Sequence, residues 1–323
     1  MNGVRHLSQT LQSILAQSLD QFDLIVSDDR SDDETLELVR QVCGDRARIV
    51  VNSERLGLAG NWNQCIAVID TPFVAIIHQD DVLRPGHLRL HLKAFEASED
   101  IGLVASAAAV IDDAGKEVPP SIVGRGGLGP IEHRFRAGEA LAKMAVGNPL
   151  RCSAVSLRAA AHARAGGFDP DLRYAVDWDH WLKIATDWSI HWSAETSVDI
   201  RWHPASETHR FKSGITDLEE SEAILKRLLI HLESFAAISY TVRNQARRGL
   251  SRAYLNRAHD LLRRGDGWFS RQCLKKSLHL SPGILGTILR DPRLAAQMVS
   301  VLAAPRLSGH LFKRASPLSE LAR

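Results

Sequence analysis

The sequence has few cysteines and no long apolar run. Its 323 residues include four cysteines, which lie far apart and show none of the short spacings of metal-binding motifs. Free thiols and a reducing compartment are therefore expected. No apolar run approaches the roughly 20 residues that a membrane-spanning helix needs, and no signal peptide precedes the first expected helix. We predict a cytoplasmic protein.

Two ligand-binding signatures are also missing. No Gly-rich phosphate loop lies near the amino terminus, which argues against a sugar-phosphate nucleotidyltransferase. No zinc spacing or platform of stacking aromatics accompanies the basic residues, which argues against a nucleic-acid-binding protein. The composition, 45% hydrophobic and 24% charged, is that of a globular protein. The length suits one large α/β domain with a smaller helical region.

Charge is distributed unevenly along the chain. Residues 240–323 contain 16 Lys and Arg against 4 Asp and Glu, although the whole chain has a net charge of only +2. The preceding residues are therefore acidic, which suits a site built around a cation. The basic region predicts peripheral contact with an anionic membrane, and we expect this at the inner membrane face. A solvated basic face without a partner is the alternative.

Strand-like and helix-like segments alternate over the first 100 residues. The expected helices are 4–19, 31–42, 58–69 and 85–97, and the expected strands are 22–26, 48–51 and 73–77. Repeated β-α-β order predicts an open, mostly parallel sheet flanked by helices. From Asp217 onward nearly every segment is helical. We therefore predict an α/β domain over residues 1–215 and a basic helical region over 216–323.

Pairs of carboxylates follow two of the expected strands. Asp28 and Asp29 follow the first, and Asp80 and Asp81 follow the third. A single Asp there is usually a helix cap or a turn residue. Two pairs at the carboxyl ends of neighbouring strands would repel one another unless a divalent cation or a sugar–nucleotide relieved the repulsion. The pairs therefore predict a ligand site.

Four motifs occur in a characteristic order. They are VSDDRSDDET at 26–35, NSERLGLAGNWN at 52–63, HQDDVL at 78–83, and GGFD at 166–169 followed by VDWD at 176–179. Together they resemble the family 2 glycosyltransferases of GT-A fold, over about residues 2 to 205. Compared with that family, the chain lacks a first strand before residue 4, and we expect the true start to lie upstream. Gln79 replaces the first acid of a strict DxD motif.

The resemblance implies roles for the acidic residues. Nucleotide contacts are expected at Asp28, Asp29, Asn61 and Asp80. Asp29 would accept a hydrogen bond from a uracil imide, and Asp80 would hold the ribose. Asp81 would bind Mg²⁺ or Mn²⁺ and bridge it to the diphosphate. His203 is a second metal candidate, with a structural role as the alternative, and Arg201 or Arg210 is a candidate phosphate contact.

Asp177 is the expected general base. It lies in a segment rich in tryptophan, where apolar surroundings raise the basicity of a carboxylate. The tryptophans are expected mainly in the core. Asp179 is the alternative base, but two residues apart on a helix means a different face.

The activity implied is inverting transfer of a sugar from a nucleotide-diphosphate donor, UDP-linked, to an acceptor hydroxyl. The acceptor would be a glycan or a lipid-linked molecule of surface polysaccharide or glycolipid synthesis. Acceptor specificity is expected in the loop 119–136 and around Asn148. The alternative function is a non-catalytic relative that binds a nucleotide sugar or a glycan.

Overall fold

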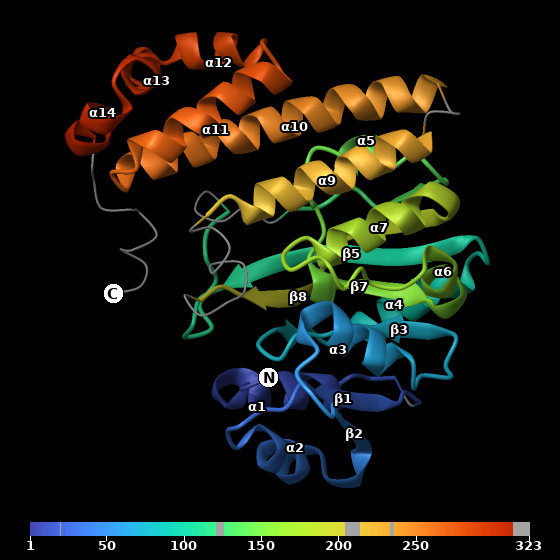
Figure 1. Cartoon of the computed structure of the whole chain (residues 1–323). Coiled ribbons are helices and arrows are strands. Elements are labelled where there is room, and N and C mark those ends of the chain that lie inside the picture. The colour runs from blue at the N-terminus through green and yellow to red at the C-terminus, as the bar shows by residue number, and fades with distance from the viewer. Residues whose placement is uncertain (20, 121–125, 204–213, 233–235, 313–323) are drawn as a thin grey trace. The chain divides into compact units, whose positions relative to one another are not determined.

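The computed structural model describes residues 1–19, 21–120, 126–203, 214–232 and 236–312 (Figure 1). The chain forms two compact units. Unit 1 comprises Met1–Met144 and Asn148–His203, and unit 2 comprises Ala145–Gly147 and Pro204–Arg323. The expected domain boundary near residue 215 falls just after the undescribed stretch 204–213.

Unit 1 begins with a small parallel sheet. Strand β1 (Leu24–Asp28) pairs in parallel with β2 (Ala47–Val51). Helices α1 (Val4–Leu15) and α2 (Thr35–Cys43) bury Leu7, Leu11 and Val39 against these strands, because apolar residues recur at helical spacing along both helices. Helix α3 (Gly57–Ile66) then packs against β1.

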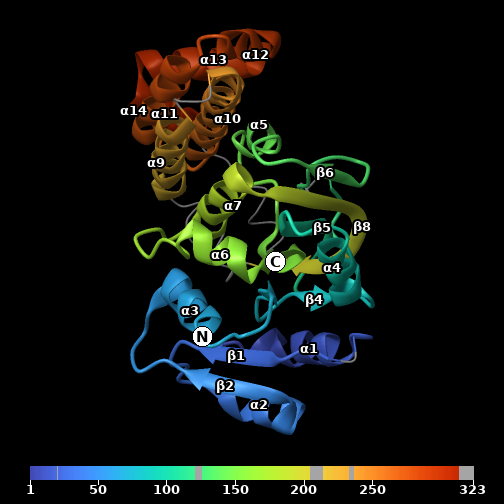
Figure 2. The ribbon, with the colours of Figure 1, turned by 90° about the vertical axis from the view of Figure 1, so that its right-hand side faces the viewer.

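The second sheet of unit 1 has six strands, in the order β3-β7-β5-β8-β4 with β6 beside β8 (Figure 2). The strands are β3 (Phe73–Ala75), β4 (Val82–Leu83), β5 (Ile101–Ile111), β6 (His133–Phe135), β7 (Val155–Arg158) and β8 (Ser189–Arg201). Its helices are α4 (His87–Glu96), α5 (Leu141–Met144), α6 (Ala159–Ala165) and α7 (Val176–Asp187). Strand β5 is buried along nearly its whole length, since it lies between β7 and β8 and beneath α4, α6 and α7.

The α/β class with an open sheet and a helical C-terminal region is confirmed. The sheet is mixed, however, and not mostly parallel as expected. Among the described residues of the larger sheet only β5 and β8 pair in parallel, and the other strand pairs are antiparallel. The β-α-β pattern could not show this, because β7 and β4 reach their neighbours from distant parts of the chain. Among the described residues no strand pairing joins β1 to β3, so the sheet is divided into two. The first strand of the family, which this sequence lacks, was expected in this part of the sheet.

Unit 2 is mainly helical in its described residues. Its helices are α9 (Thr216–His231), α10 (Ala236–Arg263), α11 (Gly267–Leu280), α12 (Ile284–Arg290), α13 (Pro292–Ala303) and α14 (Pro305–Leu311). Tyr254, Leu262 and Leu274 lie at the centre of its apolar core. Arg257 forms a buried bidentate ion pair with Asp217, at 2.7 and 3.0 Å. None of the described helices has the length and apolar character needed to cross a membrane.

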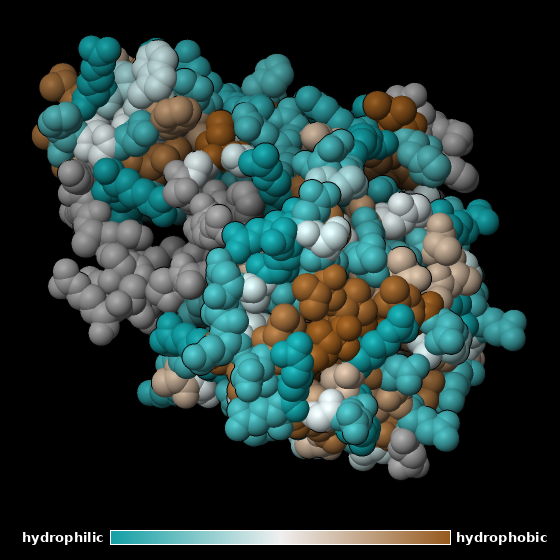
Figure 3. Space-filling model, turned by 60° about the horizontal axis from the view of Figure 1, so that its bottom comes forward, coloured by the Kyte–Doolittle hydropathy of each residue, from teal (hydrophilic) through white to brown (hydrophobic). Residues whose placement is uncertain are grey.

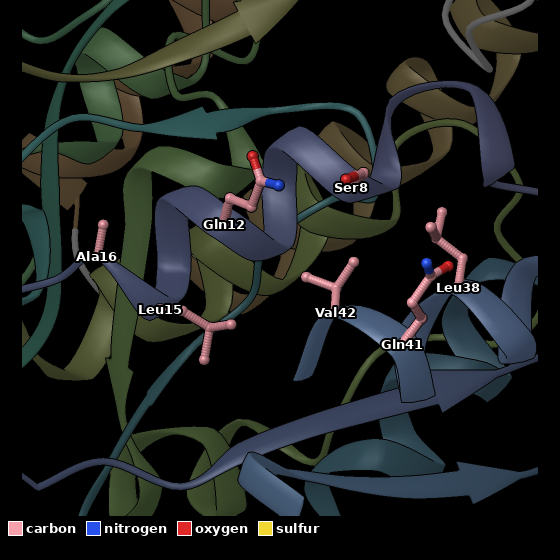
Figure 4. Close-up of a pocket in the computed structure, with 7 residues that line it drawn as sticks. All are labelled: Ser8, Gln12, Leu15, Ala16, Leu38, Gln41 and Val42. Carbon is pink, nitrogen blue, oxygen red and sulfur yellow. The ribbon is translucent and has the colours of Figure 1, made fainter. Parts of the chain in front are cut away.

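A cleft of about 600 Å³ lies between α1 and α2 (Figure 4). It is lined by Ser8, Gln12, Leu15, Ala16, Leu38, Gln41 and Val42, none of which has an ionisable side chain. The side of unit 1 that carries α1, α2, β1 and β2 also shows an apolar area rimmed by polar residues (Figure 3). The cleft contains none of the expected site residues, so the chemistry lies elsewhere in unit 1.

Candidate functional site

The loops that follow the strands bring most of the expected site residues into unit 1. Asp28 ends β1, the segment 78–81 follows β3, and His203 follows β8. Asp177 lies in the first turn of α7, which begins at Val176. Arg210 lies outside the described residues.

Asp29 holds the start of α3. Its carboxylate accepts hydrogen bonds from the Leu56 and Gly57 backbone N–H groups, at 2.7 and 2.9 Å, and from Asn52 Nδ2 at 2.9 Å. Asn52 also donates to Asn61 Oδ1 at 2.8 Å, so it joins two of the expected nucleotide contacts. Asn52 Oδ1 is buried without a hydrogen-bond partner among the described residues. The sequence placed Asn52 in a motif but gave no signal for this linking role.

Asp28 is buried and organises the turn after β1. Its carboxylate accepts from the Ser31 backbone N–H at 2.8 Å and from Ser31 Oγ at 2.5 Å. Between them Arg30 adopts a left-handed conformation with φ of 58°, which L side chains rarely adopt. Both carboxylate oxygens of Asp28 therefore accept hydrogen bonds that stabilise the turn.

A candidate cation site lies in residues 78–81, which we refer to as the metal segment. One ligand atom from each of His78, Asp80 and Asp81 lies within 4.8 Å of the others. Asp80 Oδ2 also lies 2.9 Å from His203 Nε2. His78 Nε2 and His203 Nδ1 are buried and make no hydrogen bond within the described ranges. Carboxylate and imidazole groups of this kind suit a divalent cation.

Asp81 is more deeply buried than Asp80 and has its own partners. Its Oδ1 accepts from the Arg201 backbone N–H at 2.9 Å, and its Oδ2 accepts from Ser153 Oγ at 2.5 Å. Burial raises the pKa of Asp81 to about 6, while nearby His78 and these hydrogen bonds act in the opposite direction. Sequence reasoning missed Ser153, because it lies 72 residues from Asp81.

Arg201, expected as a phosphate contact, is buried and fixes backbone instead. Its guanidinium donates to the carbonyl oxygens of Asp80, Asp112 and Asp113, and to Gln9 Oε1. These four acceptors occupy all three of its nitrogens. Arg201 therefore positions the metal segment.

Asp177 is a half-buried carboxylate with two hydrogen bonds. It accepts from the Trp178 backbone N–H at 2.7 Å and from Asn148 Nδ2 at 2.9 Å. Burial raises the pKa of Asp177 above its ordinary value, although these hydrogen bonds and nearby His78 lower it. A raised pKa suits a carboxylate that must accept a proton.

Asp179, the alternative base, is engaged within its own helix. It is buried and pairs with Lys183 at 2.7 Å, one turn further along α7. Trp178, Trp181 and Trp192 are buried in the core, and Trp178 Nε1 donates to the Met144 carbonyl. These tryptophans are therefore part of the protein core beside Asp177.

Asp81 of the metal segment and Asp177 of α7 both lie close enough to Cys152 to affect its thiol. Burial raises the pKa of the Cys152 thiol, and the charges of Asp177 and Asp81 raise it further. The Trp62 ring stacks on His78, with centroids 5.5 Å apart, and meets Phe168 edge-on at 4.9 Å. Residues of α3, of the metal segment and of the loop before α7 thus meet in unit 1.

The order of these loops in a GT-A-like sheet agrees with the family resemblance. Residues 2–156 match the model of glycosyl transferase family 2. Residues 2–156 of this chain belong to glycosyl transferase family 2. EpsE of Bacillus subtilis (strain 168), a protein assigned as a glycosyltransferase, is 26% identical over 191 residues, which cover 57% of this chain and 63% of EpsE. Relatives of this kind support a glycosyltransferase.

Solved structures of other proteins share the fold of this family 2 chain. Residues 1–349 of S. aureus TarS, in complex with UDP-GlcNAc, superpose with a TM-score of 0.60 at 15% identity, covering 98% of this chain and 90% of that one. The chain spans 53% of a longer TarS structure. The mannosyltransferase PcManGT from Pyrobaculum calidifontis, in complex with GDP-Man and Mn²⁺, gives 0.55 at 14% identity, covering 94% and 82%. At these identities the likeness establishes the fold.

Proposed function

We propose that this protein is a metal-dependent, inverting glycosyltransferase that moves a sugar from a nucleotide-diphosphate donor, UDP-linked, to an acceptor hydroxyl. The observation that carries the proposal is Asp177, a half-buried carboxylate whose pKa is raised and which lies near His78 of the metal segment. TarS with UDP-GlcNAc and PcManGT with GDP-Man support a nucleotide-sugar donor.

Asp177 would take the proton of the acceptor hydroxyl as its oxygen attacks the anomeric carbon from the face opposite the nucleotide. The bond to the diphosphate breaks as the new glycosidic bond forms, so the anomeric configuration inverts. Asn148, which donates to Asp177, would hold the carboxylate in orientation. We also propose that the segment around Asn148 and residues 119–136 set acceptor specificity. Residues 121–125 of the expected loop lie outside the described residues, and 133–135 form strand β6.

The donor nucleotide would lie beside Asp29, Asn52 and Asn61. Asp29 binds the α3 backbone through both oxygens, whereas the buried Asn52 Oδ1 offers a free acceptor for an N–H of the base. Asp28 contributes by shaping the turn. Asp80 would reach the ribose and diphosphate side of the donor.

The residues present fit a divalent cation, and we propose Asp80 and His203 as its ligands, with His78 at hand. This shifts the expected role from Asp81, whose two oxygens already accept hydrogen bonds from Ser153 and Arg201. A bound cation would stabilise the charge that develops on the departing diphosphate. Because Mg²⁺ prefers oxygen ligands, the imidazoles favour Mn²⁺, the ion named with PcManGT.

We propose the acceptor only as a class of molecule. It would be a glycan or a lipid-linked molecule of surface polysaccharide or glycolipid synthesis, and the protein would act at the inner membrane face. The domains 1–215 and 216–323 are kept as the catalytic and the basic helical parts. The charge of residues 240–323 supports peripheral contact of the second part with an anionic membrane.

The test has two readouts on the same protein. Thermal shift with UDP- and GDP-sugars, in Mn²⁺ or in chelator, measures donor binding. Release of nucleoside diphosphate measures turnover. Asp177→Asn should retain the Mn²⁺-dependent thermal shift and lose nucleotide release by roughly 10²- to 10⁴-fold.

Asp187→Asn, the same substitution at the exposed end of α7, is the matched control and should leave both readouts unchanged. Normal release by Asp177→Asn would remove Asp177 from the mechanism. Donor binding by the unaltered protein without release, across acceptor mixtures, would favour the non-catalytic relative.

A further inference from the structure

Large apolar side chains are exposed where α11 begins and along α14. Trp268 and Phe269 are 55% and 45% exposed, and Leu307 and Leu311 are 67% and 77% exposed. We refer to these four residues as the apolar cluster. Large apolar groups exposed together on one surface are typical of interaction sites.

The members of the apolar cluster come from helices that touch through their backbones. A Cβ built on Gly267 would lie 1.7 Å from the Pro305 carbonyl oxygen, and one on Gly309 would lie 2.3 Å from the Gly265 oxygen. Only glycine permits such an approach. Figures 1 and 2 both show α14 against α11. Leu307 and Leu311, one helical turn apart, share a face of α14.

The stretch of chain that carries the apolar cluster is basic. Residues 267–312 contain six Lys and Arg against one acidic residue. Arg306, exposed and adjacent to Leu307, is one of these. Exposed leucine and aromatic side chains beside basic residues are the composition of surfaces that lie in the headgroup region of anionic membranes. A second copy of the chain would bring the same positive charges together, which disfavours self-association.

We propose that the apolar cluster inserts into the interface of an anionic lipid bilayer, with Arg306 and the neighbouring basic residues against the lipid phosphates. This surface gives the membrane contact of the proposed function a defined place in unit 2. It rests on that proposal only for the presence of a membrane, since binding to a bilayer requires no turnover.

Vesicle flotation of the whole chain tests the surface. The vesicles are phosphatidylcholine alone, or phosphatidylcholine with about one third phosphatidylglycerol. The unaltered protein should float with the anionic vesicles and remain behind with the neutral ones. Leu307→Ser/Leu311→Ser should weaken binding to the anionic vesicles by roughly 10- to 100-fold, because two leucines no longer leave water.

Ile230→Ser/Tyr240→Ser is the matched control. These residues, 67% and 71% exposed, belong to the end of α9 and the start of α10. In Figure 1 these two helix ends lie at the opposite end of unit 2 from α14. The control should float like the unaltered protein. Equal flotation of both double variants would overturn the proposal, as would equal binding to neutral vesicles.

Two measurements without lipid complete the design. A dimer of the unaltered protein that is lost in Leu307→Ser/Leu311→Ser would assign the apolar cluster to a second copy, and so overturn the bilayer proposal. Nucleotide release by the same variant should remain unchanged, which supports a binding role separate from chemistry. If no form of the protein, including the unaltered one, released nucleoside diphosphate, this result would count against the proposed function. Flotation would still test whether the apolar cluster binds the membrane.

Discussion

The hydrogen bond from Asn148 to Asp177 gives a quantitative prediction for the pH dependence of turnover. Asn148→Leu removes one of two donors to the ionised carboxylate and leaves the Trp178 N–H in place. A hydrogen bond to a charged group contributes about 1.5–3 kcal/mol, and one pKa unit corresponds to about 1.4 kcal/mol. Because Asp177 is half-buried, water replaces part of this bond. The pKa of Asp177, already raised by burial, should rise by about 0.5–1 further unit.

A base must be ionised to act, so activity is present above the pKa of Asp177 and lost as the pH falls through it. The acid limb of kcat/KM for donor hydrolysis in Mn²⁺ should therefore move to higher pH in Asn148→Leu, with a similar plateau at alkaline pH. Asn256→Leu, at an exposed position of α10, should leave the limb in place. A limb that stays put or moves to lower pH in Asn148→Leu would refute the assignment of Asp177 as a base stabilised by Asn148.

Three further substitutions test the site and the fold. Asp80→Asn should weaken Mn²⁺ binding in calorimetry at least tenfold without loss of thermal stability; unchanged affinity would contradict a direct ligand. Ser153→Ala should lower the melting temperature more at pH 8 than at pH 5, because Asp81, with a pKa of about 6, is ionised mainly at the higher pH and has then lost one of its two hydrogen-bond donors; equal losses would contradict this. Arg257→Met should reduce the free energy of unfolding by about 3–5 kcal/mol because it leaves Asp217 buried and charged; a loss below 1 kcal/mol in urea unfolding would be inconsistent with the buried pair.

The sequence carried enough local signal to predict the fold class. Most expected helices and strands of the first 100 residues are present, with ends displaced by a few residues. Two differences have identifiable causes. The helix expected from residue 31 begins at Thr35, because the N–H and the hydroxyl of Ser31 both donate to Asp28 in the turn before it. The helix expected from Pro85 begins at His87, since Gly86 adopts a left-handed conformation with φ of 84°.

The candidate site was predictable in its residue types and less so in their roles. The acidic pairs that follow the strands were visible in the sequence. The groups that donate hydrogen bonds to these carboxylates, however, lie far away along the chain. Asp81 accepts from Ser153 and from Arg201, which is 120 residues away. Such partners decide whether a carboxylate is free to bind a ligand, and only the folded chain brings them together. Asp80, with a partly exposed carboxylate beside His203, thereby becomes the stronger candidate ligand.

Consecutive residues of α3 connect the three parts of the site. Asn61 joins the nucleotide side through Asn52, and Trp62 stacks on His78 of the metal segment. Asn63 binds Phe168 twice, donating to its carbonyl at 2.8 Å and accepting from its N–H at 2.9 Å. The loop that leads to the base is thus anchored on the same helix whose first turn is held by Asp29. Since a helix is rigid over three residues, α3 fixes the spacing between the donor side and the base side, which is the distance that a single displacement must keep constant.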